Sequence, residues 1–209
     1  MKRIAIDLQY LPGLEYFAAI RGAEEIFLLP KDRYQRQSFA NRTQVLLANK
    51  VQTLSVPIQG RRPRVPLDEV RIDYTQNWVA THLRGLQSAY GKAPFFDYFF
   101  PYIEAALLRQ ETQLWTLNLN LLTICLKLLR WSVKLTVLEN EPLPADVVDL
   151  RGQILPSSPF TTRNYYAPVP YIQLFGADFA PNLSVLDLLF CTGTDADDLL
   201  RKSQKKHEQ

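Results

Sequence analysis

The chain has 209 residues, of which 47% are hydrophobic and 22% charged, and its net charge is +3. This is the composition of an ordinary globular protein, and it excludes intrinsic disorder and a collagen-like fold. Eight glycines against fourteen prolines argue against a glycine-rich phosphate loop or a propeller. The near-neutral total gives little counterion release on binding DNA or RNA, which argues against a nucleic-acid partner.

The N-terminal apolar run ends at Asp7, too early for the apolar region of a signal peptide. The most apolar later stretch, residues 114–129, contains two asparagines and a lysine, so it does not predict a membrane span. We therefore expect a cytoplasmic protein without membrane insertion. The two cysteines lie inside apolar runs and there are only two histidines, so we expect no metal site.

In the first third of the chain, short apolar runs alternate with polar or proline-containing loops. The turn-like Ala-Asn-Lys tripeptide at 48–50 predicts a hairpin, and Pro12 is typical of a residue near a helix start. We expect strands at 4–8, 25–29 and 70–74, a short helix at 14–21, and a hairpin with strands 42–47 and 51–58.

The middle of the chain changes to helical periodicity, with expected helices at about 77–91, 96–111 and 114–131. The third helix is the clearest, because its polar residues recur at alternating steps of four and three and form one narrow stripe. They are Thr116, Asn120, Thr123, Lys127 and Arg130. The rest of this helix is almost entirely apolar, so we expect it to be buried.

The last third predicts a strand at 134–138, proline-punctuated loops at 139–179, and a helix at 185–190. Ser184 and Asp187 have the spacing of a capping box for that helix, which should end near Gly193. We expect a single α/β domain over residues 1–201, with a mixed sheet and the buried central helix Leu114–Trp131, followed by a polar, frayed tail at 202–209.

Charge is distributed unevenly along the sequence. Residues 31–71 contain nine basic and three acidic side chains, whereas residues 139–198 contain two basic and nine acidic ones. The two segments could pair within one domain, or they could leave a positive cleft for an anion such as a phosphate, nucleotide or carboxylate.

The turn after the first strand offers the first candidate binding residues, Asp7, Gln9 and Tyr10, because ligands collect beyond the carboxyl ends of strands in α/β sheets. The structural alternative is that Asp7 caps backbone amides and Tyr10 packs. A second candidate is the basic loop with Arg36, Asn41 and Arg42, whose guanidinium groups could hold an anion. A solvated loop that pairs with the acidic segment is the alternative.

The helix end at Tyr90, followed by Lys92, is the third candidate, since a lysine there could bind a phosphate or, if desolvated, act as a base. We interpret His82 as a packed or exposed histidine more readily than as a general base. Arg61, Arg62 and Arg64 are interpreted as a flexible surface loop. The sequence contains no G-x-S-x-G, P-loop or G-x-G-x-x-G motif, so no motif indicates a reaction.

Four segments, in this order, together resemble the WbqC-like family across essentially the whole chain. They are Ile6–Phe17, Phe39–Arg42, Leu54–Pro57 together with Ala89–Pro94, and Asn182–Phe190 together with Gly193. The resemblance implies a bacterial cytoplasmic protein of surface-polysaccharide gene clusters. It further implies action on nucleotide-linked amino sugars or their acyl donors, and hence an anionic small-molecule partner.

The chain departs from the family at its first segment, where many members carry His-Gln-Pro and this sequence has Ile6, Asp7 and Leu8. Either Asp7 has taken over a catalytic role, or this branch binds without catalysis. Alternation along a strand would place residues 6 and 7 on opposite faces, which argues against a simple replacement. A transferase is therefore weighed against a non-catalytic binding or assembly partner in envelope biogenesis. From the basic loop and the resemblance together, the expected ligand contacts are Gln9, Tyr10, Arg36, Asn41, Arg42, Tyr90 and Lys92.

Overall fold

The computed structural model describes residues 2–48, 50–60, 65–176 and 178–205. Two sequence interpretations therefore lie outside the described residues: the surface loop at Arg61, Arg62 and Arg64, and the last four residues of the polar tail.

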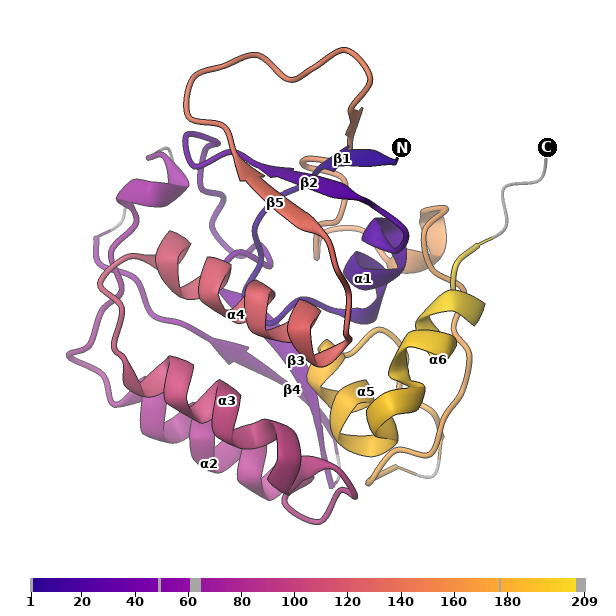
Figure 1. Cartoon of the computed structure of the whole chain (residues 1–209). Helices are drawn as coiled ribbons and strands as arrows, with labels where there is room; N and C mark the ends of the chain where they lie inside the picture. The colour runs from indigo at the N-terminus through magenta and orange to yellow at the C-terminus, as the bar shows by residue number, and fades with distance from the viewer. Residues whose placement is uncertain (1, 49, 61–64, 177, 206–209) are drawn as a thin grey trace.

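Four short strands form one parallel sheet in the order β5-β2-β1-β6 (Figure 1). They are β1 (Arg3–Ala5), β2 (Glu25–Leu28), β5 (Lys134–Val137) and β6 (Val148–Asp149). The helix α1 (Leu14–Ile20) connects β1 to β2, as parallel neighbours require a crossover. Because all four strands run the same way, their carboxyl ends lie along one edge of the sheet.

The two faces of this sheet differ in polarity. Ile4 and Ile26 are fully buried on the face that meets the core, where Figure 1 shows α1 and α4. On the other face, the carboxylate of Glu25 accepts hydrogen bonds from Arg3 Nε (2.9 Å) and Lys134 Nζ (2.7 Å). Alternation along each strand thus gives an apolar inner face and an ion-paired outer face.

A separate antiparallel hairpin is formed by β3 (Arg42–Leu47) and β4 (Lys50–Ser55). The α/β fold predicted from the sequence is confirmed, with parallel and antiparallel pairing divided between two sheets. The strand expected at 70–74 forms only isolated bridges, Ile58 with Ile72 and Arg71 with Gln113. Its backbone hydrogen bonds are divided between two segments, residues 112–114 on one side and 57–59 on the other, so no continuous ladder forms.

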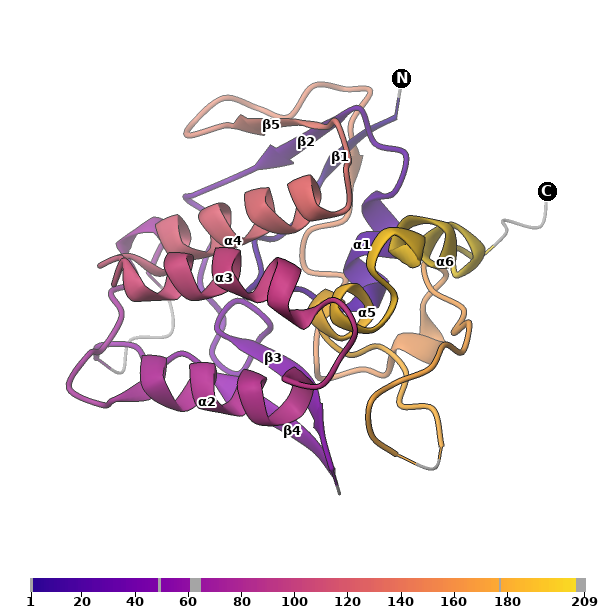
Figure 2. The same cartoon turned by 60° about the horizontal axis from the view of Figure 1, so that its bottom comes forward.

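Three helices fill the middle of the chain: α2 (Trp78–Tyr90), α3 (Phe96–Leu108) and α4 (Leu114–Leu128). Figure 2 shows α4, α3 and α2 stacked one beneath the other, away from the parallel sheet. Leu121 and Leu122 of α4 are completely buried, so the prediction of a buried central helix is confirmed. It ends before Trp131 because Arg130 takes a left-handed backbone conformation with φ of 59°.

The C-terminal part contains α5 (Val185–Thr192) and α6 (Ala196–Lys202). The hydroxyl of Ser184 accepts from the N–H of Leu186 and caps α5, but the carboxylate of Asp187 turns away from the cap toward Tyr171, whose hydroxyl donates to it over 2.5 Å. The expected tail begins later than position 202, because Lys202 belongs to α6 and Ser203 is buried. Among the residues that the structure describes, no helix combines the length and apolar character that a membrane crossing needs.

Candidate functional site

A polar cleft lies at the carboxyl edge of the parallel sheet. β1 ends at Ala5 and β2 at Leu28, so the residues that follow each strand, Asp7 and Asp32, both line it. Gly152, which follows β6, completes this part of the wall. Loops that leave the carboxyl ends of neighbouring parallel strands are the usual place for a ligand in such a fold.

The cleft continues past the sheet between two loop segments, residues 33–42 and 152–157. Its inner part, about 50 Å³, adjoins an outer hollow of about 390 Å³ that includes Arg36. A narrow side hollow reaches from Gln9 to Arg42. We call this continuous surface the strand-edge cleft, defined by Asp7, Gln9, Asp32, Arg33, Gln35, Arg36, Ser38, Arg42 and Leu155. The inner part has room for a few waters or one end of a ligand, and only the outer hollow approaches the size of a small-molecule pocket.

Asp7 is a partly buried carboxylate in this cleft. The backbone N–H of Gly152 donates to its Oδ2 over 2.6 Å. Burial raises the pKa of Asp7 and the charges of Asp32 and Asp149 add to the effect, while the Gly152 N–H and Arg151 oppose it. Asp7 therefore both accepts a backbone hydrogen bond and lines the cleft. Asp7 thus holds its proton more tightly than an ordinary aspartate.

The two neighbouring carboxylates share one guanidinium as their ion-pair partner. Arg151 donates to Asp32 through Nη1 (2.9 Å) and to Asp149 through Nε (2.9 Å) and Nη2 (2.7 Å). The hydrogen bond from Arg151 lowers the pKa of Asp149. Asp7 makes no ion pair in the described part of the chain, so it differs from both neighbours in having no cation in direct contact.

Asp32 and Arg151 were not among the residues chosen from the sequence. Asp32 follows the second strand as Asp7 follows the first, so the strand-edge rule could have found it. Arg151 follows β6, a strand of two residues with no periodic pattern, and nothing in the sequence marks it.

The basic loop supplies the positive part of the cleft. Within the described residues, Arg33, Arg36 and Arg42 take part in no ion pair, and the buried Nε of Arg42 has no hydrogen-bond partner. Among the described residues, one ion pair joins the basic segment 31–71 to the acidic segment 139–198, that of Asp32 with Arg151. Asp32 is one of the few acids of the basic segment, and Arg151 is one of the two bases of the acidic segment. The basic segment thus leaves guanidinium groups free for an anion.

Two amide side chains lie near these arginines. Gln9 lines the cleft while its Nε2 donates to the carbonyl of Ile154 over 3.3 Å. Asn41 is buried and its Nδ2 donates to the carbonyl of Val56 over 2.8 Å, so it ties the loop to β4. Its Oδ1 is buried without a partner.

Three other residues chosen from the sequence lie away from the cleft. Tyr10 is completely buried and its hydroxyl pairs with Nδ1 of His82 at 2.9 Å. The hydroxyl of Tyr90, also buried, accepts from the N–H of Leu46 over 3.1 Å. Lys92 is exposed in the connection between α2 and α3. Leu46 is four residues along β3 from Arg42, about 13 Å at the rise of a strand, so Tyr90 and Arg42 face different surroundings.

Of the sequence-selected residues, the structure therefore brings together Asp7, Gln9, Arg36 and Arg42. Among the described residues, no group of three or more His, Cys, Asp or Glu side chains is arranged to hold a metal ion. The cleft has carboxylates at its inner end and unpaired guanidinium groups at its outer end, an arrangement suited to orienting a polar ligand with a negative group.

Fold and cleft together define an α/β protein with a polar cleft at the carboxyl edge of a short parallel sheet. The chain belongs to the WbqC-like protein family, whose model matches residues 9–148. It is 29% identical to the uncharacterized protein Rv1507c of Mycobacterium tuberculosis over 96% of this chain and 98% of that protein. No solved structure gives a significant match.

The segments that carry the family resemblance converge in part on the cleft. Residues 6–17 and 39–42 both contribute lining side chains, and Asn182 and Ser184 of the C-terminal segment line the side hollow next to Arg42. The segment 54–57 supports the basic loop through the Asn41 contact. Within the described residues, the segment 89–94 lines none of the three parts of the cleft.

Proposed function

We propose that the strand-edge cleft binds an anionic small molecule, with the negative group held by Arg36 and Arg42. The observation that supports this most is the unpaired state of these guanidinium groups, together with the buried, partnerless Nε of Arg42. A buried donor without an acceptor is costly, and a phosphate or carboxylate oxygen would remove that cost. Gln9 and Ser38 add polar groups along the same wall.

The ligand class is a nucleotide-linked sugar or an acyl thioester, as the family resemblance implies. The outer hollow is large enough for a phosphate-bearing group, while the inner part accepts only the end of the ligand. The longer portion of such a ligand would lie along the segment 152–157.

A transferase acting on amino sugars would use Asp7 as its general base or acid. β1 ends at Ala5 and Asp7 follows it into the cleft, whereas Ile6, the position of the family's histidine, is buried in the core. Burial raises the pKa of Asp7, which favours proton exchange nearer neutral pH than an ordinary aspartate allows. This acid–base role of Asp7 is part of the proposal, and it requires that Arg36 and Arg42 already hold the negative group of the ligand.

A non-catalytic assembly partner is the second candidate function. The observation that favours it is the exposed aromatic surface of α3, where Tyr98 and Tyr102 are 71% and 57% exposed. Aromatic side chains one helical turn apart can dock a partner protein.

The binding proposal is tested by thermal shift and calorimetry with nucleotides, UDP- and dTDP-sugars, and coenzyme A derivatives. A ligand at one hundred times its Kd should stabilise the protein by about 2.7 kcal/mol. We expect Arg42→Gln to weaken binding of that ligand at least tenfold, because a charge-assisted contact contributes roughly 1.5–3 kcal/mol.

Arg84→Gln is the matched control, since Arg84 is an exposed arginine of α2 and should leave the affinity unchanged. Equal losses in both variants would contradict the placement of the anion at Arg42. If no compound in the panel shifts the melting temperature, the assembly-partner function is favoured instead.

A further inference from the structure

A second hollow of about 570 Å³ lies on a different part of the surface from the strand-edge cleft. Its walls come from the residue before β1, the second half of α1, residues 164–165, and the end of α6 with the residues after it. The polar side chains around it include Lys2, Asn164, Arg201, Lys202 and Lys205. Among the described residues that line it there is no carboxylate. We call this surface the terminal groove.

Two of its lysines are fixed by backbone carbonyls. The ammonium of Lys2 donates to the carbonyls of Ala19 (3.1 Å) and Arg21 (3.0 Å), and that of Lys205 donates to the carbonyl of Arg163 (2.5 Å). Neither takes part in an ion pair within the described chain. Carbonyl oxygens orient an ammonium but leave its net charge in place. Lys2 and Lys205 are therefore positioned cations whose charge is compensated by no carboxylate of the described residues.

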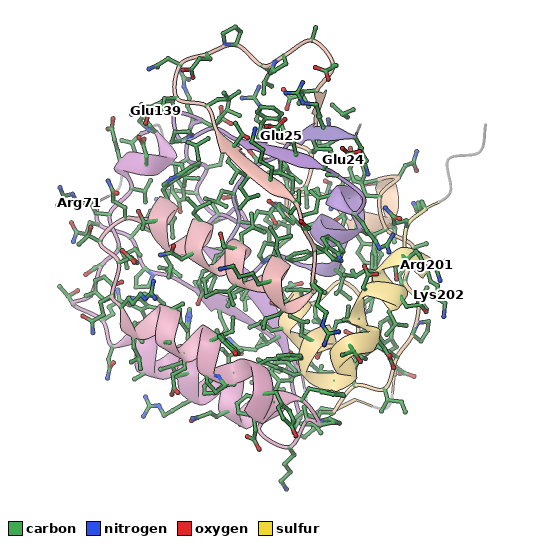
Figure 3. The ribbon with its side chains drawn as sticks, in the orientation of Figure 1. Glu24, Glu25, Arg71, Glu139, Arg201 and Lys202 are labelled. Atoms are coloured by element: carbon green, nitrogen blue, oxygen red, sulfur yellow. The ribbon has the colours of Figure 1, made fainter. Side chains whose placement is uncertain are left out.

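The other two cations project from the end of α6, where Figure 3 shows Arg201 and Lys202 next to each other at the surface. Both pair with the same carboxylate, Asp198, and Lys202 Nζ lies 2.6 Å from it. These side chains are more than half exposed, so the pairs are weak and can be exchanged for another anion. Among the described residues, the groove thus gathers four positive charges, and the Asp198 carboxylate is shared by two of them.

We propose that the terminal groove is a second binding site, for a small ligand that carries a phosphate or diphosphate group. Several ammonium groups around one hollow suit an anion with two or more charges, because lysines act on phosphate as movable point charges. Its volume lies within the range of small-molecule pockets.

Partial burial supports the choice of Lys2 as the central contact. Desolvation and the nearby charge of Arg21 both lower the pKa of Lys2. A phosphate in the groove would compensate its charge and oppose that shift. The site does not depend on the proposed function, because the described residues of the groove and of the strand-edge cleft do not overlap.

The test is calorimetric titration with pyrophosphate and with inorganic phosphate at low ionic strength, where screening is weakest. We expect pyrophosphate to bind, and the double variant Lys2→Gln/Lys205→Gln to lose at least tenfold in affinity. The matched control is Lys50→Gln/Lys127→Gln, which removes two exposed lysines elsewhere and should leave the affinity unchanged.

Equal losses in both double variants, or no pyrophosphate binding at all, would overturn the proposal. A loss caused by Arg42→Gln alone would place the anion in the strand-edge cleft and would overturn it as well. Because the variant at Lys2 also loses two backbone contacts, Arg201→Gln/Lys202→Gln provides a second measurement. This second double variant changes exposed side chains only, and it should also weaken pyrophosphate binding. An unchanged affinity would contradict the proposal that the terminal groove binds the anion.

Discussion

The hydroxyl of Tyr10 meets Nδ1 of His82 at 2.9 Å inside the core, and the indole of Trp78 packs edge-on against the same imidazole at 5.0 Å. Burial lowers the pKa of His82 to about 4, so this histidine is neutral in the folded protein at physiological pH. Tyr10, which was predicted from the sequence as a ligand contact, is therefore part of a buried polar pair with His82.

We expect this pair to make the protein less stable in acid. An unfolded histidine has a pKa near 6.5 and gains its proton as the pH falls, whereas folded His82 resists protonation down to about pH 4. The unfolded state binds more protons in this window, so stability is lost as the pH decreases from 6.5 toward 4. Between pH 7.5 and 5.0 the loss from His82 should be about 2 kcal/mol.

The measurement is urea unfolding of the native protein and His82→Asn at both pH values. Asp187 contributes with the opposite sign, because burial raises its pKa and the folded state then holds the proton more tightly. The difference between the two proteins removes that contribution. An equal pH dependence in both would show that His82 does not titrate in this way.

At the scale of elements, the end of α5 depends on a glycine that no other residue can replace without strain. Gly193 has φ of 57°, and a Cβ built on it would lie 2.4 Å from the ring of Phe95. Phe95 itself donates its backbone N–H to the carbonyl of Phe190 over 3.0 Å, which fixes its backbone beside the end of α5. The contact joins α5 to the connection between α2 and α3.

Gly193→Ala should therefore destabilise the protein by about 3 kcal/mol, from the left-handed backbone and the overlap together. Gly22→Ala is the matched control, because Gly22 also has a positive φ, 79°, but nothing lies within 4 Å of its missing Cβ. It should cost only about 1 kcal/mol. Chemical denaturation measures both, and similar losses would show that Phe95 moves aside freely.

The sequence predicts well those helices and strands whose buried and exposed residues recur at a regular spacing within the element itself. The polar stripe of α4 could be predicted because Lys127 is exposed and Leu121 is buried, and their spacing in the sequence alone places them on different faces of the helix. β6 has no such pattern, since its two residues become a strand only by pairing with Ile4 and Ala5. The segment 152–157 follows that pairing, so its part of the cleft wall could not be predicted.

Across the whole molecule, ion pairs join the N-terminal residues to the last third of the chain. Glu15 and Arg163 form the most buried of these, with side chains 1% and 11% exposed and two contacts of 2.6 and 2.7 Å. Nη1 of Arg163 also donates to the hydroxyl of Ser158 and, over 3.4 Å, to the carbonyl of Leu155, which lines the strand-edge cleft. The pair thus holds α1 against the segment that lines the cleft.

Glu15→Gln should cost about 3 kcal/mol or more, because it leaves a buried guanidinium without its carboxylate. Lys31→Gln, which breaks the more exposed pair with Asp68, should cost less than about 1 kcal/mol. Urea midpoints of the two variants give the comparison. If Glu15→Gln lowers the free energy of unfolding no more than Lys31→Gln does, water reaches Arg163 and the pair of Glu15 with Arg163 does not hold α1 in place.

The strand order has a consequence for synthesis on the ribosome. β2 pairs on one side with β5, and Glu25 is 109 positions before its partner Lys134. At roughly 5–20 residues per second, β1 and β2 leave the exit tunnel several seconds or more before either outer strand exists. During that interval the apolar side chains of Ile4 and Ile26 have no finished sheet to join, so this fold relies on late, long-range closure.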